Sequence, residues 1–336
     1  SLVGSEMCIR DSIDTHCHFD FPPFAADEVA SLARAAQAGV GRIIVPAISA
    51  ERFSRVLALA AQHEALYAAL GMHPIVIEEH TDEGLAQLEA LMAQRPPKLV
   101  AVGEIGLDLY RDDPQFDRQQ ALLEAQLRLA KRYDLPVILH SRRTHDKLAM
   151  LLKKHALPRT GVIHGFAGSL QQAERFVQLG YKIGVGGTIT YPRASKTREV
   201  MARLPLSALL LETDAPDMPL NGFQGQPHLA IVHKIILVKI DPALTESGVF
   251  PPFMSLHDDE IIDRFDLFRG IITEDGFQNE LVIVLIIEPA QERFLLHELF
   301  HGLIIIVNDG IFSGGLVLED NCLLYTSDAA DEARSV

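Results

Sequence analysis

The stretch SIDTHCHFD, residues 12–20, opens the pattern that decides the fold, because in it a short apolar run ends in two histidines. Successive side chains of a β-strand point to opposite faces, so an extended segment would place His16 and His18 on one face and Cys17 on the other. A single His-x-His pair is weak evidence for a site in a chain with 14 histidines. The rest of the chain therefore has to show whether other apolar runs end in the same way.

Further short apolar runs follow at regular intervals, and helical patterns rich in Ala, Leu, Gln, Glu and Arg separate them. The predicted strands are 12–18, 41–48, 65–72, 98–105, 135–140, 161–166, 181–187 and 207–213. The predicted helices lie near 27–38, 51–63, 82–94, 115–133, 144–155, 169–179 and 195–203. This alternation predicts an α/β fold, and a (β/α)₈ TIM-type barrel fits it better than the alternative, an open doubly wound sheet.

The composition is that of a globular protein, with 48% hydrophobic and 22% charged residues in 336. No uncharged apolar run of membrane-spanning length appears, and the N-terminus lacks the pattern of a signal peptide. The chain has three cysteines, Cys8, Cys17 and Cys322, which are scattered along it and odd in number. This usage argues against a disulfide scaffold and favours a reducing compartment, so we expect a cytoplasmic protein without a membrane segment.

The charge is distributed unevenly along the chain. Up to Pro227 the chain has 24 Lys and Arg against 26 Asp and Glu, a net charge of −2, whereas from His228 onward it has 6 against 19, a net charge of −13. We therefore expect an extraneous segment at 1–11, a barrel domain at 12–227 and an atypical acidic tail at 228–336, for which a chimeric origin is one interpretation. Because the tail lacks a helical pattern that would close the barrel, incomplete closure is expected.

Polar side chains recur where the predicted strands end. The set comprises His16, His18, His73, Glu104, His140, His164 and Asp214. One histidine at a strand end is usually a structural residue, but the C-terminal ends of barrel strands meet at one mouth. Imidazoles and carboxylates gathered there would repel or stay unsatisfied unless a cation held them, and mixed nitrogen and oxygen ligands suit Zn²⁺, Mn²⁺ or similar ions. The sequence thus predicts a metal site.

The motifs IDTHCHFD, GMHP, VAVGEIGLD, LPVILHSR, VIHGFAGS and LLLETDAP resemble, in order and spacing, those of the TatD-family metal-dependent hydrolases, which include deoxyribonucleases. The resemblance covers about residues 12–227 and implies a TIM-type barrel with two divalent metal ions, Zn, Mn or Mg. It implies one ion held by His16, His18 and Asp214, a second held by His140 and His164, and Glu104 as a bridge. It also implies that His73 and Glu212 contact the scissile phosphate or the attacking water.

The resemblance does not extend to the ends of the chain. Residues from 228 onward lack the short helical ending of the family. The segments SLVGSEMCIRDS, residues 1–12, and CLLYTSDAADE, residues 322–332, resemble translated sequencing-adapter read-through. The tail also contains HELFH, residues 297–301, which fits the zinc motif H-E-x-x-H. Three fixed positions in an atypical segment make this a weak signal.

Two ions could together bind a phosphate, activate water and neutralise the leaving oxygen. The predicted function is therefore a phosphodiesterase or deoxyribonuclease with DNA as substrate, in which Glu104 and Asp214 are catalytic and Asp214 acts as general base. Arg142, Arg143 and Arg193 near the mouth either contact phosphates or are ordinary solvated surface residues.

One alternative function is a metal-dependent hydrolase of amide, lactone or aminoacyl-ester bonds. Many such amidohydrolases use a carboxylated lysine near the end of the fifth strand, whereas here that strand ends in His140, which argues against this alternative. Another is an inactive chimeric chain. No protein partner is evident.

Overall fold

The structure, a computed structural model, describes residues 12–38 and 40–222 and four strands at 234–240, 281–287, 303–307 and 310–314. The predicted extraneous segment 1–11 and the HELFH motif lie outside the described residues. The division into three segments therefore stays a prediction.

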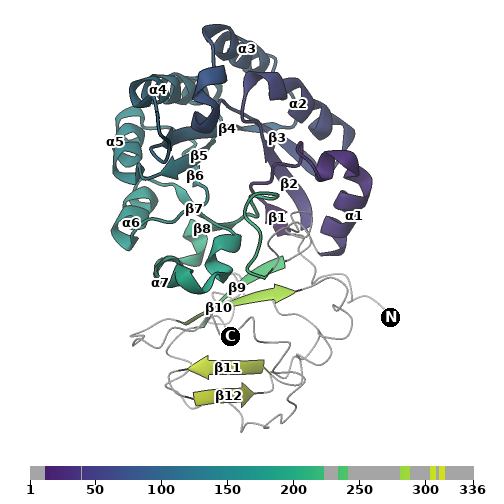
Figure 1. The fold of residues 1–336 in the computed structure, drawn as a ribbon, viewed down its shortest axis with the longest axis vertical. Helices are drawn as coiled ribbons and strands as arrows, with labels where there is room; N and C mark the ends of the chain where they lie inside the picture. The colour runs from purple at the N-terminus through teal and green to yellow at the C-terminus, as the bar shows by residue number, and fades with distance from the viewer. Residues whose placement is uncertain are drawn as a thin grey trace, which may run out of the picture.

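Parallel strands form the centre of the molecule, and each one is hydrogen-bonded to the next in chain order (Figure 1). They are β1 (Ser12–Asp14), β2 (Val40–Pro46), β3 (Leu66–Leu70), β4 (Leu99–Asp108), β5 (Val137–Arg142), β6 (Gly161–Ile163), β7 (Lys182–Val185) and β8 (Leu209–Leu211). This order confirms the (β/α)₈ TIM-type barrel, because a doubly wound sheet would reverse its strand order at a switch point.

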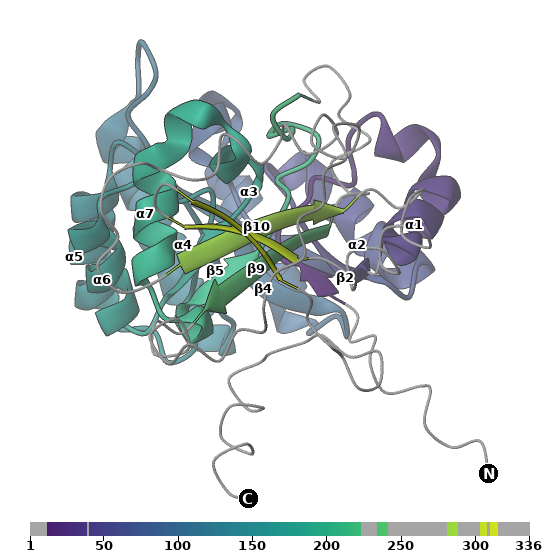
Figure 2. The same cartoon turned by 90° about the horizontal axis from the view of Figure 1, so that it is seen from below.

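Helices connect successive strands and cover the outside of the sheet, as Figure 1 and the turned view of Figure 2 show. They are α1 (Glu28–Gln37), α2 (Phe53–Gln62), α3 (Asp82–Ala93), α4 (Phe116–Tyr133), α5 (His145–His155), α6 (Leu170–Gln178) and α7 (Ser195–Arg203). Local signals fix their starts: the Thr81 hydroxyl accepts the Gly84 N–H ahead of α3, and Ser169 forms a capping box with Gln172 at α6. No helix in the described part of the chain has the length and apolarity to cross a bilayer.

Short 3₁₀ helices, which the sequence pattern does not predict, lie in the connections. They are η1 (Phe24–Ala26), η2 (Ala50–Arg52), η3 (Pro74–Glu79), η4 (Gly187–Thr190), η5 (Pro192–Ala194) and η6 (Leu206–Ala208). Segments of one or two turns are too short for an amphipathic period to be recognised.

Apolar side chains form two separate layers. The large layer lies between strands and helices and includes Ile43, Leu139 and Phe176. The small layer comes from the strands alone, with Ala69, Ala101, Ile138 and Val162 buried together against Ile44 and Leu210. This second cluster fills the interior of the barrel and forms the floor beneath its mouth.

The barrel is nearly closed and has a seam between β1 and β8. Across the seam, the Thr15 N–H donates to the carbonyl of Leu211 over 3.0 Å and the His18 N–H to that of Ala215 over 2.8 Å. The Asp214 N–H in turn donates to the carbonyl of His16 over 2.8 Å. Within the described residues no helix follows β8. The segments that join the seam are therefore the ones that carry His16, His18 and Asp214.

Further along the chain, β9 (Lys234–Ile240) pairs with β10 (Leu281–Ile287), and β11 (Leu303–Val307) pairs with β12 (Gly310–Gly314). Both pairs are antiparallel and stand outside the parallel barrel sheet. The tail thus contains strands of a different design from the barrel strands.

Candidate metal centre

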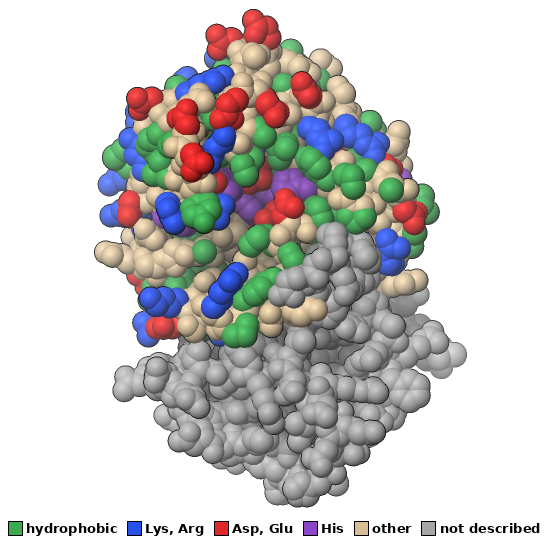
Figure 3. Space-filling model, viewed as in Figure 1, with side chains coloured by type: hydrophobic (Ala, Val, Ile, Leu, Met, Phe, Trp, Pro, Cys, Tyr) green, Lys and Arg blue, Asp and Glu red, His purple; other side chains and the backbone are tan. Residues whose placement is uncertain are grey.

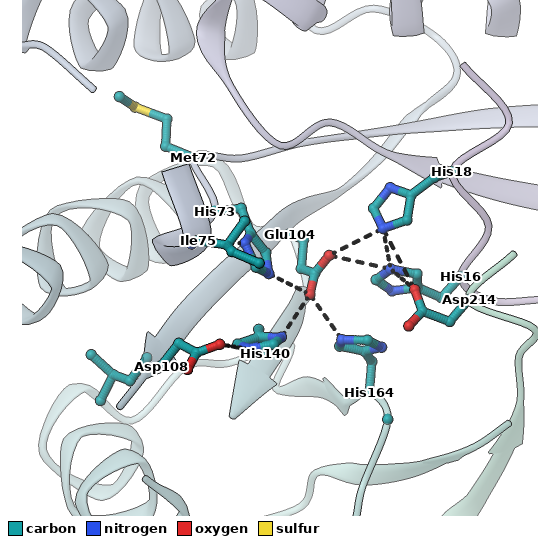
Figure 4. Close-up of polar contacts among 12 residues, drawn as sticks. His16, His18, Met72, His73, Ile75, Glu104, Asp108, His140, His164 and Asp214 are labelled. Carbon is teal, nitrogen blue, oxygen red and sulfur yellow. Dashed lines mark hydrogen bonds and ion pairs between the residues drawn. The ribbon is translucent and has the colours of Figure 1, made fainter. Parts of the chain in front are cut away.

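Glu104 lies at the centre of the mouth, where its carboxylate faces side chains from both sides of the barrel (Figure 4). Strict alternation along β4 would point Glu104 outward, because Ala101 packs in the barrel interior three residues earlier. The β4–β5 register shifts between Val102 and Ile105, and an irregularity of this kind re-aims a side chain. Glu104 is consequently turned inward and is only 2% exposed.

One oxygen of Glu104 meets the residues of the seam. Nε2 of His16 lies 3.3 Å from Nε2 of His18 and 3.4 Å from Oδ1 of Asp214. Nε2 of His18 lies 3.5 Å from the same Oδ1. Oε2 of Glu104 lies 3.3 Å from the His16 Nε2 and 3.6 Å from the His18 Nε2. A tetrahedral ion with bonds of about 2.0–2.2 Å separates its ligands by about 3.3–3.6 Å. These four side chains have the spacing that the ligands of one ion require.

The other oxygen of Glu104 meets three histidines from β5 and from the segments after β3 and β6. Its distances are 2.9 Å to Nε2 of His73, 3.2 Å to Nδ1 of His140 and 2.8 Å to Nε2 of His164. One carboxylate therefore connects two groups of donors. Figure 3 shows histidine side chains at the bottom of a hollow in this face, so the centre is open to solvent from the mouth.

Within the described residues, three groups have metal-ligand donor atoms all within 4.8 Å of one another. The groups are His16, His18 and Asp214; His16, Glu104 and His164; and His73, Glu104 and His140. The structure thus brings together the whole predicted ligand set. His73, predicted to contact substrate, lies beside Glu104 and His140.

The hydrogen bonds of His73 distinguish it from a ligand. Its Nδ1 accepts the Ile75 N–H over 3.0 Å, so the proton of a neutral ring sits on Nε2. That Nε2 faces Glu104. A metal-binding nitrogen must offer a lone pair, whereas Nε2–H is a donor. His73 is therefore set to donate a hydrogen bond into the centre.

Asp108 is a site residue that the sequence analysis missed. It ends β4, and its Oδ2 accepts a hydrogen bond from Nε2 of His140 over 2.9 Å. This contact holds the proton on Nε2 and leaves the lone pair of Nδ1 facing Glu104. The predicted strand 98–105 ends before Asp108, whereas the observed strand includes it. In an extended strand, alternate residues of the motif GEIGLD share one face, so Asp108 lies on the same face as Gly106. Alternation counted from Gly106 therefore places Asp108 on the inner face.

Two further carboxylates are buried behind the centre. Asp14 accepts the backbone N–H groups of His16 and Thr213, both over 3.1 Å, and so ties the two sides of the seam. Glu212 accepts the Gly165 N–H over 2.5 Å and lies 3.8 Å from Nδ1 of His164. A Cβ at Gly184 would collide with the Glu212 carboxylate, so this glycine makes room for it. Glu212 lies behind His164, on the far side of its ring from Glu104.

Burial and mutual contacts shift the pKa values of these groups strongly. Burial raises the pKa of Asp214, and it raises that of Glu212 to about 7. Burial would also raise the pKa of Glu104, but His73, His164 and His16 hold it well below its usual range. Burial and the neighbouring His164 lower the pKa of His16 to about 3. A cation would stabilise a buried set of carboxylates and imidazoles of this kind.

The predicted basic residues lie around the mouth. Arg142 ends β5, Arg143 follows it, and both lie over the ring of Tyr110. Arg193 lies 5.3 Å from the centre of the Tyr191 ring in the β7–α7 connection. None of them forms an ion pair with another of the described residues.

The TatD related DNase family matches residues 13–240, which is more than half of the chain. The chain belongs to the TatD-related DNase family. Among its relatives is the uncharacterized metal-dependent hydrolase YjjV of Escherichia coli K12, 77% identical over 216 residues that cover 64% of this chain and 83% of that protein. The crystal structure of E. coli YjjV, a TatD homologue, matches 66% of this chain and 87% of its own with a TM-score of 0.65 and 75% identity.

A more distant relative in the family is the 3'-5' ssDNA/RNA exonuclease TatD of Rahnella sp. Y9602, 33% identical over 211 residues, which cover 61% of this chain and 78% of that protein. Family membership confirms the resemblance that the sequence motifs indicate. This TatD-family chain is a metal-dependent hydrolase on a TIM-type barrel, and the donors around Glu104 are the groups that suit its metal.

Proposed function

We propose that this chain is a nuclease that hydrolyses phosphodiester bonds in DNA with two divalent cations. The observation that carries the proposal is the position of Glu104. Its Oε2 faces His16 and His18 at 3.3 and 3.6 Å, and its Oε1 faces His140 and His164 at 3.2 and 2.8 Å. A single carboxylate between two donor groups is the arrangement that a bridged pair of ions needs.

The donor chemistry fits this assignment. His16, His18, Asp214 and Oε2 of Glu104 would hold one cation, and His140, His164 and Oε1 of Glu104 the other; mixed nitrogen and oxygen ligands suit Zn²⁺ and Mn²⁺ better than Mg²⁺. Bound there, two ions would polarise the phosphate, lower the pKa of a water and neutralise the leaving oxygen.

The side chains around the ions have separate tasks. Asp214 orients the attacking water and accepts its proton, since it lies at the mouth with a side chain that is 17% exposed. The Nε2–H of His73 is a donor that would turn from Glu104 to a phosphate oxygen when substrate enters. Glu212 has a supporting role behind His164, because its Oε1 is already taken by the Gly165 N–H.

Two findings favour nucleic acid over an amide or lactone. The exonuclease TatD of Rahnella acts on ssDNA and RNA by name, so RNA is a second polymer to test. In addition, β5 presents His140 at the mouth and no lysine. We also place the enzyme in the cytoplasm, on the cysteine usage of the chain and the buried free thiol of Cys17.

The test measures metal content and hydrolysis together. The full chain, loaded with Mn²⁺ or Zn²⁺ and freed of excess ion, is expected to hold two ions per chain by elemental analysis and to shorten a 5'-labelled single-stranded oligonucleotide. Glu104→Gln should lower the metal content and reduce turnover by at least about a hundredfold, because one neutral amide cannot bridge two cations. Glu124→Gln, which removes a carboxylate from the outer helix α4, should retain both.

One ion per chain with full activity would contradict the two-metal centre. Loaded enzyme that cleaves p-nitrophenyl acetate or an acyl-homoserine lactone but no oligonucleotide would instead favour the carboxylic ester and amide class.

A further inference from the structure

Next to the metal centre, the rim of the mouth carries an aromatic ring in contact with two arginines. Tyr110 follows β4 and is 52% exposed. The Cζ atoms of Arg142 and Arg143 lie 3.7 and 4.5 Å from the centre of its ring. Most large apolar side chains of the described residues are buried, so an exposed tyrosine ring is unusual. A ring with two guanidinium groups beside it is a surface suited to planar, electron-rich ligands.

Tyr110 is anchored to the metal centre by hydrogen bonds. Its N–H donates to Oδ1 of Asp108 over 2.7 Å, and Oδ2 of the same carboxylate accepts from His140 over 2.9 Å. The neighbouring Leu109 N–H donates to the carbonyl of Arg142 over 3.0 Å, which extends the β4–β5 pairing to the rim. The ring is thus connected to His140 through the single side chain of Asp108.

The backbone after β5 explains why two consecutive arginines reach one ring. Neighbouring residues of an extended strand point to opposite faces. Arg143, however, adopts a left-handed conformation with φ of 61°, which few residues other than glycine adopt. This turn breaks the alternation and lets both guanidinium groups approach Tyr110.

A groove of about 920 Å³ continues from this point along the rim. It begins at Leu109 and Arg143 and runs between the starts of α5, α6 and α7, with Lys147 and Lys196 in its wall. Its two acidic residues already have partners, because Asp146 binds Gln172 and Arg175, and Glu199 binds Arg203. The three basic side chains form no ion pair with other described residues, so the groove presents unpaired positive charge.

Arg52, on the other side of the mouth, also lies on an aromatic ring but is paired with a carboxylate of the protein. Arg52 lies 3.5 Å from the centre of the Phe21 ring, but its Nε also lies 3.3 Å from Oδ2 of Asp20, a carboxylate that is only 3% exposed. Arg52 therefore compensates a buried charge within the protein. Arg142 and Arg143 have no such partner among the described residues and remain available to a ligand.

We propose that Tyr110, Arg142 and Arg143 form a stacking platform for a nucleobase of single-stranded nucleic acid, and that Arg143, Lys147 and Lys196 bind the phosphates that follow along the groove. The inference rests on the proposed nuclease function and names the part of the substrate that is read beside the scissile bond. Bases stack on tyrosine rings and on guanidinium planes alike, and such stacking is independent of sequence. Paired bases inside a duplex cannot reach the platform, so the surface selects unpaired strands.

The first experiment measures binding without cleavage. In the Glu104→Gln background, the Kd for a fluorescent ten-residue thymidine oligomer is compared with that for a ten-residue oligomer of abasic sites with the same charge. Tyr110→Leu should raise the Kd for the thymidine oligomer about tenfold, and that for the abasic oligomer less than threefold. Tyr110→Phe keeps the ring and should bind the thymidine oligomer within threefold of its parent. Equal losses for both oligomers with Tyr110→Leu would overturn the platform.

The second experiment separates this inference from the proposed function. The ratio of kcat/KM for the thymidine oligomer to that for methyl p-nitrophenyl phosphate, a phosphodiester without a base, should fall about tenfold with Tyr110→Leu. Arg159→Ala removes an exposed arginine from the loop before β6, at the opposite end of the barrel, and should leave the ratio at its wild-type value. An unchanged ratio in Tyr110→Leu would reject the platform alone, whereas a wild-type enzyme that cleaves neither phosphodiester would reject the nuclease function.

Discussion

Asp108 illustrates how a side chain that does not itself bind the metal can determine which nitrogen of a histidine ligand faces it. An imidazole coordinates a metal through the ring nitrogen that carries no proton. A carboxylate that accepts a hydrogen bond from the other nitrogen holds the proton there and so determines which nitrogen coordinates. In this chain Asp108 accepts from Nε2 of His140 and, with its second oxygen, from the Tyr110 N–H. Its two oxygens thus serve the metal centre and the rim at once.

Asp108→Asn should therefore weaken metal binding without unfolding the barrel. An amide has one acceptor, so either His140 or the Tyr110 N–H loses its partner, and the affinity for Mn²⁺ or Zn²⁺ should fall about 10- to 100-fold. Competition with a fluorescent chelator measures this affinity directly. Asp146→Asn, an exposed carboxylate on α5, is the matched control and should bind metal as the wild type does. Unchanged affinity in Asp108→Asn would show that His140 needs no such orientation.

At the scale of elements, the pairing of β4 with β5 determines where the donors lie. Gly106 pairs with His140 in this register and has a φ of 154°. A Cβ at this position would collide with the backbone carbonyl of His140. The close approach of the two strands at the mouth therefore depends on a residue without a side chain.

Gly106→Ala is expected to push β5 away and to destabilise the metal-free protein by roughly 3 kcal/mol. Gly165→Ala offers a comparison, since Gly165 also has a positive φ, 54°, but no atom lies within 4 Å of its added Cβ. That variant should lose only about 1 kcal/mol, from backbone strain alone. Urea unfolding in the presence of EDTA gives both values. Equal losses would mean that the collision at His140 is relieved at no cost.

The packing of α4 on α5 includes an ion pair that titrates far from the metal centre. Glu124 accepts from Nζ of Lys154 over 2.7 Å and from Nε2 of His155 over 3.0 Å. The hydrogen bond from Lys154, helped by those from Gln120 and His155, lowers the pKa of Glu124 to about 2. The folded state therefore binds the proton more weakly than the unfolded chain does.

This shift predicts a pH-dependent loss of stability. A carboxyl whose folded-state pKa is lowered stabilises the fold above its unfolded pKa, and the contribution disappears as the pH falls toward the folded value. Glu124→Gln should cost about 1 kcal/mol at pH 7, and the difference from wild type should shrink steadily between about pH 5 and pH 3. Denaturant unfolding at several pH values tests this. A difference that stays constant over this range would assign the effect to packing and not to charge.

For the whole molecule, the distribution of charge decides how a polyanion can bind. The barrel region up to Pro227 is nearly neutral at −2, so attraction must come from the metal ions and from locally grouped cations. The groove at the rim supplies three such side chains, Arg143, Lys147 and Lys196.

The salt dependence of oligonucleotide binding should reflect this number. Each phosphate contact with a single strand contributes about 0.7 to the slope of log Kd against log salt, so three contacts predict a slope of about 2. Arg143→Ala should lower the slope by about 0.7, and Arg159→Ala should leave it unchanged. Fluorescence anisotropy between about 50 and 200 mM NaCl resolves these differences. A wild-type slope near zero would rule out a phosphate track along the groove.

The change in net charge at Pro227, from −2 before it to −13 after it, leads to a second prediction for the whole chain. We expect limited proteolysis of the full chain to cut first beyond Pro227 and to leave a core that still binds metal. Mass spectrometry of the fragments and their metal content test this. If the residues beyond Pro227 are cut no faster than the barrel, the tail is an integrated domain and the chimeric interpretation is wrong.

Much of the barrel and of its donor set follows from local pattern. His140 lies two residues after Ile138, His164 two after Val162 and His73 four after Ala69, and these three apolar residues form the barrel interior. Because alternation has a period of two, each of these histidines must appear on the inner face at the mouth. The resemblance of the motifs added which residues share an ion, and the family match supports that resemblance.

Tertiary structure decided what alternation could not. Glu104 lies three residues after Ala101 and would point outward, yet the irregular β4–β5 register turns it to the centre. The seam then brings Nε2 of His16 within 3.4 Å of Oδ1 of Asp214, although the two residues lie at opposite ends of the barrel sequence. The strand pattern fixes the face on which a side chain lies, because it depends on the local backbone alone. Which donors meet depends on register and barrel closure, which only packing of the whole chain determines.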